Sequence, residues 1–134
     1  MHRLEWSEAF RVGHAALDQQ HEGLLTLINR LIDLDRGVDA RVFTAVLNEL
    51  LEYAEKHFSV EEELMQVHGF SGMAAHLAEH EDFVQSVIRL RQRFDSSDAT
   101  CRGVARFFLK SWYVGHVLGT DRQYIPLLSA ETPL

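Results

Sequence analysis

Seven side chains of the types that bind transition metals occur at spacings that can bring them together. Two pairs, His57 with Glu61 and His76 with His80, are four residues apart. On a helix this spacing places both side chains on one face, with Cβ atoms about 5–6 Å apart. His116 and Asp121 are separated by five residues across an expected helix end at Gly119. The candidate metal ligands are His21, His57, Glu61, His76, His80, His116 and Asp121.

The elements that must position these residues are four long amphipathic helices. Apolar residues recur at helical spacing over about Ala15–Arg36, Ala40–His68, from a cap at Ser71 to about Phe94, and over about Ala99–Leu118. Short connections favour antiparallel neighbours, so we expect an all-α, up-down-up-down four-helix bundle with an N-terminal arm and a short C-terminal segment. The candidate ligands then lie at similar depth at one end of the bundle.

The apolar stripes of these helices predict which residues form the core. We expect Leu24, Phe43, Leu50 and Phe83 to face inward, and Val104 to do so in the last helix. Glu62 and Glu63 continue the acidic run after Glu61 and are expected on a solvated face. Because the candidate ligands fall on the inner stripes, and burying an unpaired carboxylate costs several kcal/mol, metal ions are the expected compensation.

Length and composition limit the possible functions. At 134 residues the chain is expected to form a single domain, residues 1–134, and its net charge of −7 argues against nucleic acid or an anionic membrane as partner. A lone cysteine, Cys101, fits a reducing compartment, and the N-terminus has no signal-like apolar run. We therefore expect a cytoplasmic location.

The number of candidate ligands predicts two metal ions. Seven exceed what one octahedral ion accepts, and zinc sites are usually satisfied by four. If two six-coordinate ions share two bridging carboxylates and one bridging oxygen, five histidines leave a single position open. The bridging modes in this count are assumptions.

The order and spacing of these residues resemble the hemerythrin family, in particular the stand-alone bacterial hemerythrins. The matching segments are Gly13-His14 with Leu17-Asp18-Gln19-Gln20-His21, His57-Phe58-Ser59-Val60-Glu61, His76-x-x-x-His80 and Trp112-x-x-x-His116-x-x-x-x-Asp121. They extend over nearly the whole chain, from Trp6 to about Tyr124.

This resemblance implies reversible O2 binding at a non-haem di-iron centre with a bridging oxo or hydroxo group. It implies that one iron is bound by His76, His80 and His116, the other by His21 and His57, and that Glu61 and Asp121 bridge them. The resemblance also implies that the diferrous pair would pass two electrons to O2 and hold it as hydroperoxide, with the bridging hydroxide supplying the proton. The resemblance implies that the apolar O2 pocket is formed by Leu24, Phe58, Trp112, Tyr113 and Val117.

Tyr113 departs from the family pattern, which usually has an aliphatic residue at this position. One interpretation is that the ring packs and the hydroxyl reaches solvent or a backbone carbonyl. The other is that the hydroxyl forms a hydrogen bond to the bound oxygen species or to a terminal water.

The resulting expectation is an oxygen carrier, for storage or delivery, rather than an enzyme. Its expected partners are O2 and an oxygen-consuming enzyme. The alternatives are a di-iron sensor of O2, redox state or nitric oxide, a ferritin-like di-iron oxidase, and a structural bundle with incidental histidines. Ferritin-like sites are rich in carboxylates and use Glu-x-x-His motifs, which the ligand cluster of this chain does not show.

Overall fold

The chain folds into a bundle of four helices, as the sequence predicts. The computed structural model describes residues 3–34, 40–92, 99–120, 123–124 and 126. Its helices are α1 (Ala15–Asp33), α2 (Ala40–Val67), α3 (Met73–Gln92) and α4 (Ala99–Gly115). A short 3-10 helix, η1 (Glu8–Phe10), precedes α1, and a π-helix, η2 (His116–Thr120), follows α4. No strand occurs among these described residues.

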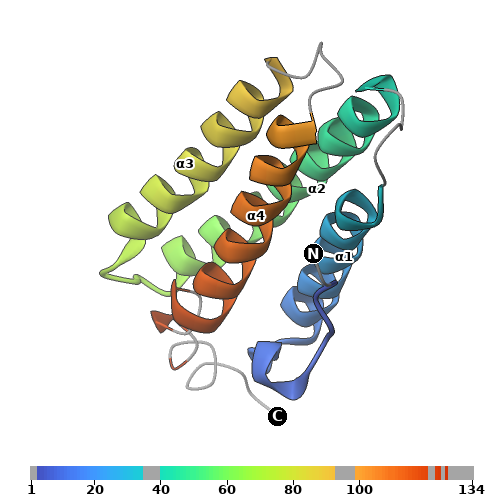
Figure 1. Ribbon diagram of the computed structural model, residues 1–134. Helices are drawn as coiled ribbons and strands as arrows, with labels where there is room; N and C mark the ends of the chain where they lie inside the picture. Colours follow the sequence, from blue (N-terminus) through green and yellow to red (C-terminus); the bar gives the residue numbers. More distant parts are fainter. Residues whose placement is uncertain (1–2, 35–39, 93–98, 121–122, 125, 127–134) are drawn as a thin grey trace.

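The helices run antiparallel to their neighbours in the chain. In Figure 1 the end of α1 and the start of α2 lie at one end of the bundle, together with the end of α3 and the start of α4. The end of α2 and the start of α3 lie at the other end. The described boundaries differ from the expected ones by at most three residues, and the expected ends at Arg36 and Phe94 lie outside the described residues. The end of α4 is affected by a change of helix type. There the α-helix ends at Gly115, and the expected termination at Gly119 falls inside the wider turn of η2. Single π turns often occur at functional sites, and this one begins with His116.

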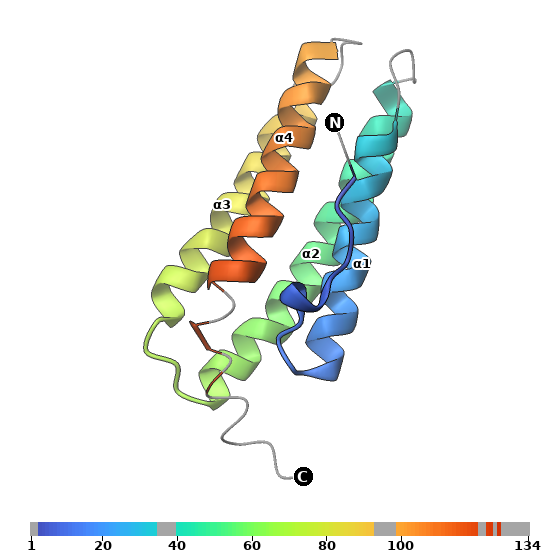
Figure 2. The same cartoon turned by 60° about the horizontal axis from the view of Figure 1, so that its bottom comes forward.

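The N-terminal arm lies along the bundle between α1 and α4 (Figure 2). Asn29 on α1 binds it through two hydrogen bonds, one from the Leu4 amide (2.8 Å) and one to the Leu4 carbonyl (2.7 Å). The Val12 amide donates to Asp18 Oδ1 at 2.7 Å. The ring of Phe10 meets that of Tyr113 edge to face, with centroids 5.4 Å apart. The arm therefore covers part of the interior next to α4.

Two apolar clusters of unequal size fill the interior. The larger cluster begins at the end of the bundle where α1 ends and α2 begins, and it extends to Leu24, Ala54 and Phe58. The smaller cluster consists of Val12, Leu17, Met65 and Tyr124. Leu17 is four residues before His21, and Met65 is four residues after Glu61. One turn of helix thus separates the smaller cluster from the candidate ligands, which lie between two apolar layers.

The core prediction is wrong for Val104, which is 56% exposed. The inner stripe of α4 runs through Ala105, Leu109 and Tyr113 at four-residue intervals. Because Val104 is one residue before this stripe, it is rotated about 100° away from the core. Phe107 on the same helix is 66% exposed. None of the described helices is both long enough and apolar enough to cross a membrane.

Candidate metal centre

The candidate site is built around the carboxylate of Glu61, which is fully buried on α2. Five imidazoles direct their Nε2 atoms at it: one from α1, one from α2, two from α3 and one from the start of η2. His21 Nε2 lies 3.6 Å from Oε2. The Nε2 atoms of His57, His76, His80 and His116 lie 3.5, 3.7, 3.0 and 3.9 Å from Oε1. All five histidines are buried.

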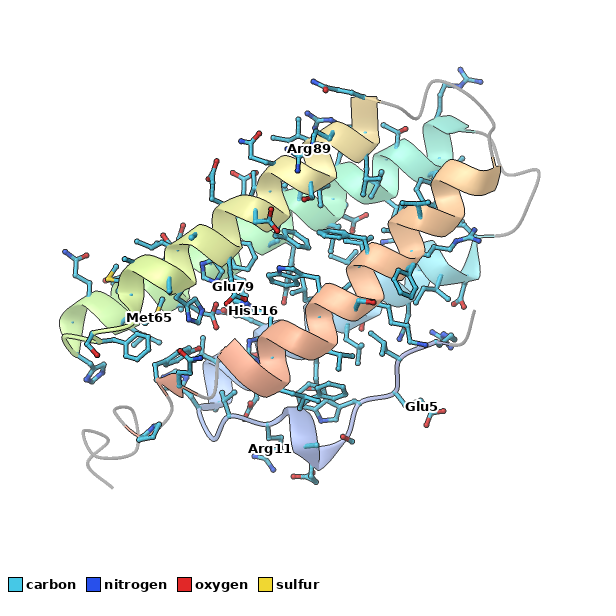
Figure 3. The ribbon with its side chains drawn as sticks, turned by 60° about the vertical axis from the view of Figure 1, so that its left-hand side comes forward. Glu5, Arg11, Met65, Glu79, Arg89 and His116 are labelled. Carbon is cyan, nitrogen blue, oxygen red and sulfur yellow. The ribbon has the colours of Figure 1, made fainter. Side chains whose placement is uncertain are left out.

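The outer nitrogens of three imidazoles contact oxygen atoms of side chains near the surface. His80 Nδ1 lies 2.9 Å from Glu62 Oε2, and His57 Nδ1 lies 2.7 Å from Gln20 Oε1. His116 Nδ1 lies 3.1 Å from Glu79 Oε1, and Figure 3 shows Glu79 on α3 next to His116. An ionised carboxylate can only accept a hydrogen bond. His80 and His116 therefore carry a proton on Nδ1.

This assignment determines what the inner nitrogens can do. In a neutral imidazole protonated at Nδ1, Nε2 presents a lone pair. The Nε2 atoms of His80 and His116 are 3.3 Å apart and both face Glu61. Two lone pairs and a carboxylate at these distances repel each other in a buried site unless positive charge lies between them. Additional protons or metal cations would supply this charge.

The donor atoms fall into two groups that share Glu61. Its carboxylate forms one group with His76, His80 and His116, and the other with His21 and His57. Within each group the possible ligand atoms all lie within 4.8 Å of one another. Imidazole and carboxylate together suit first-row transition metals such as iron. The arrangement fits two ions bridged by Glu61.

The surroundings of Glu61 keep its carboxyl group ionised. Without a metal, additional protons on the imidazoles supply the positive charge. Burial by itself raises the pKa of Glu61, but the charge of His57 and hydrogen bonds from the protonated rings of His116, His21 and His76 outweigh this and lower the pKa well below its usual range. Tyr124 adds a further contact, because its hydroxyl donates to Glu61 Oε2 at 2.6 Å. The carboxylate is thus held in the charged form that a metal ion requires.

Six of the seven predicted ligands are brought together in this way. The seventh, Asp121, lies outside the described residues, but the described residues on either side of it, His116 and Tyr124, both reach the centre. His14 of the matching segment Gly13-His14 is the N-cap of α1, and its Nδ1 accepts from the Leu17 amide at 3.4 Å.

The predicted pocket residues form apolar walls around the imidazoles. The ring of Phe58 stacks on His80 with centroids 3.8 Å apart and planes 8° apart. Trp112 stacks on His116 with centroids 4.4 Å apart and planes 12° apart. Leu24, Tyr113 and Val117 are fully or almost fully buried. These contacts restrict the ring planes and place apolar surface next to the imidazoles.

The hydroxyl of Tyr113 reaches a backbone carbonyl, which is the first of the two interpretations of this residue. It donates a hydrogen bond to the backbone carbonyl of His21 at 2.9 Å, in a buried position. A phenol has a single O–H donor, so in this geometry the proton is not directed at a ligand in the centre. The bond instead joins α4 to the turn of α1 that carries His21.

Sequence reasoning missed four residues that contact the ligands: Gln20, Glu62, Glu79 and Tyr124. The expectation that Glu62 belongs to a solvated face is wrong, since it reaches His80, whereas Glu63 is exposed as expected. Glu79 directly precedes His80 in the sequence, but its contact is with His116 on the next element. One general rule could have indicated that such partners exist: a metal-bound histidine usually donates a hydrogen bond from its second ring N–H to an oxygen atom. The rule does not say which residue supplies the oxygen.

Comparisons with known proteins agree with this geometry. The family described as "Hemerythrin HHE cation binding domain" matches residues 12–128. The bacteriohemerythrin of Stenotrophomonas maltophilia is 30% identical over 128 residues, covering 96% of this chain and 83% of the relative. That of Methylococcus capsulatus is 30% identical, covering 95% of this chain and 98% of the relative. A hemerythrin-like protein of Naegleria gruberi is 34% identical, with 90% of each chain covered.

Solved structures show the same similarity. The crystal structure of a wild-type hemerythrin matches with a TM-score of 0.84 and 29% identity, covering 94% of this chain and 98% of that chain. A crystal structure of a hemerythrin variant matches with a TM-score of 0.85 over 96% of this chain. The family match extends over most of the chain and includes all the helices that carry the buried imidazoles. This chain belongs to the hemerythrin family.

Proposed function

We propose that this chain binds O2 reversibly at a non-haem centre of two iron ions, and so acts in oxygen storage or delivery. The observation that carries the proposal is the convergence of five imidazole Nε2 atoms on the buried carboxylate of Glu61. The proposed ligands are those predicted from the sequence: His21, His57, Glu61, His76, His80, His116 and Asp121. Family membership and the buried cluster together support non-haem iron.

A bound pair of ferrous ions would supply both the open coordination position and the electrons for reversible O2 binding. The protein supplies the surroundings. Three imidazoles on one side of Glu61 and two on the other make the positions unequal, so the side of His21 and His57 has fewer protein ligands. We assign the open position to this side. Leu24 and Tyr113, which we place in the O2 pocket, are both buried, and a dry pocket limits the proton access that promotes irreversible oxidation.

Asp121 completes the proposed ligand set as the second bridging carboxylate. Support comes from the neighbouring described residues, because the Tyr124 hydroxyl contacts Glu61 and His116 Nε2 faces it. A bridging oxo or hydroxo group, the cytoplasmic location and an oxygen-consuming partner enzyme stay predictions.

The donor set favours a carrier over an oxidase. Only two of the seven proposed ligands are carboxylates, which leaves little scope for the carboxylate movements that accompany oxidative turnover. A sensor of O2, redox state or nitric oxide would use the same centre. The O2 experiment below separates a redox sensor, which is oxidised irreversibly, from a carrier. A sensor of O2 or nitric oxide would be recognised by a partner protein that binds the chain in only one ligand state.

The test is an anaerobic sample loaded with ferrous iron, exposed to O2 and then purged with inert gas. A carrier changes its visible absorption on exposure and returns to the starting spectrum on purging, with about two irons per chain by metal analysis. Irreversible oxidation in one cycle, steady release of peroxide, or an iron content near zero would each overturn the proposal.

A further inference from the structure

The two sides of the centre differ in the charge of the groups that hold the imidazoles. On the three-histidine side, His80 and His116 donate from Nδ1 to the carboxylates of Glu62 and Glu79. On the two-histidine side, His57 Nδ1 faces the neutral side-chain amide of Gln20. Two negative charges therefore lie behind one candidate metal position, whereas the amide behind His57 is uncharged.

These contacts select one of two orientations for each ring. Stacking on Phe58 and on Trp112 restrains the planes of His80 and His116. A rotation of 180° about the bond from Cβ to the ring keeps that plane but replaces Nε2 at the centre by the carbon Cε1, which cannot bind a metal. On the outer side of each ring, the hydrogen bond at Nδ1 favours the orientation that keeps Nε2 at the centre. The acceptor therefore helps to hold the ring as a ligand.

We propose that Glu62 and Glu79 are positioning residues that make the position of His76, His80 and His116 the tighter of the two metal positions and the first to fill. This inference rests on the proposed two-ion centre and adds a loading order to it. A carboxylate that accepts from Nδ1 strengthens electron donation from Nε2, whereas an amide does so less. The position of His21 and His57 then binds its metal ion less tightly. This is the side to which we assign the open coordination position for O2.

The size of the effect follows from the exposure of the two acids. The side chain of Glu62 is 33% exposed and that of Glu79 is 44% exposed, so water screens part of their charge. Loss of an outer partner of a metal-bound histidine typically weakens metal binding about 10–100-fold. For these half-buried acids we expect the lower end of this range, about 10-fold for each.

The test is a stepwise titration of metal-free protein with Co2+, whose visible absorption follows each filled position without oxidation by air. Wild type should bind two ions in two steps, the first tighter. Glu62→Gln and Glu79→Gln keep a hydrogen-bond acceptor of nearly the same shape, but remove the charge. Each should weaken the first step about 10-fold and leave the second nearly unchanged. Gln20→Glu makes the reverse change and should tighten the second step.

Glu63→Gln is the matched control, because Glu63 is an exposed acid next to Glu62 on the same helix. It removes the same formal charge and should leave both steps unchanged. The Nδ1–H proton resonances of His80 and His116, shifted by the bound Co2+, give a second readout. Each should move in the variant of its own partner and in no other.

Several outcomes would overturn the inference while leaving the two-ion proposal intact. These are two equal steps in wild type, equal weakening of both steps in Glu62→Gln, or an effect of Glu63→Gln as large as that of Glu62→Gln. A wild-type stoichiometry other than two would overturn the proposed function instead. The helical circular dichroism of each metal-free variant checks that it is folded.

Discussion

Leu31, Phe43 and Leu47 at one end of the bundle are fully buried, and so are His21 and Glu61 toward the other end. The first three are hydrocarbon, and each contributes about 1.5–3 kcal/mol by leaving water. Burying an imidazole or a carboxylate costs free energy unless a partner compensates it. The apolar end can thus hold the helices together without a ligand. The stability of the other end depends on metal cations or protons that compensate its buried polar groups.

The largest effect expected from this difference is that of metal removal. Anaerobic dialysis against a chelator should lower the free energy of unfolding by about 4 kcal/mol or more, the value for a ligand present at a thousand times its dissociation constant. Hydrogen exchange should rise first in the turns that carry His21, Glu61 and His76, while the turns around Leu31 and Leu47 stay protected. Uniform loss of protection along all four helices would contradict the prediction that only the end with the candidate ligands depends on the metal.

A substitution at the apolar end should lower the stability of the fold without changing the metal content of the folded chain. Leu47→Ala removes a fully buried side chain and should lower the free energy of unfolding by about 2–5 kcal/mol. Because Leu47 lies far along α2 from Glu61, the number of ions bound per folded chain should stay the same. Denaturant unfolding with metal analysis of the folded fraction measures both quantities, and a loss of iron from folded Leu47→Ala protein would contradict this prediction.

The parts of the centre that could be predicted from sequence are those governed by helical periodicity. His57 and Glu61 share a face because they are four residues apart, and His21, His76 and His116 meet them because antiparallel helices bring early and late segments to one end. The outer partners follow no such rule. Glu62 reaches α3 and Glu79 reaches His116 because of how far each helix is rotated about its own axis, which a stripe about 100° wide does not determine.

Tyr124 was missed for a different reason. It follows the last helix expected from the sequence, and no apolar period there predicts its position, so its approach to Glu61 depends on tertiary packing. Its ring packs in the small apolar cluster while its hydroxyl reaches the carboxylate. The error at Val104 has a separate cause: this residue lies one position before the inner stripe of α4 and is exposed.

Tyr124→Phe should have an intermediate effect that is concentrated at the centre. It removes a hydrogen bond to a buried ionised carboxylate, a type that contributes about 1.5–3 kcal/mol, and it should weaken metal binding about 10-fold or more. Tyr53→Phe is the matched control, since the Tyr53 hydroxyl donates to the neutral backbone carbonyl of Gln20 at 3.1 Å. Titration of metal-free protein with Co2+ and denaturant unfolding compare the two. Equal metal affinity in both variants would show that the Tyr124 hydroxyl does not position Glu61.

The smallest effect is expected at Tyr113, where the hydroxyl proton is already used on the carbonyl of His21. Tyr113→Phe should cost about 0.5–1.5 kcal/mol, the usual contribution of a neutral hydrogen bond. It should leave the visible spectrum of the O2 complex unchanged, because the ring still packs against Phe10 and the pocket keeps its shape. Tyr113→Leu removes the ring contact as well and should speed irreversible oxidation by admitting water. Stopped-flow spectra of both variants decide between packing and a direct contact with O2: a spectral shift already present in Tyr113→Phe would mean that the hydroxyl turns from the carbonyl to the ligand when O2 binds.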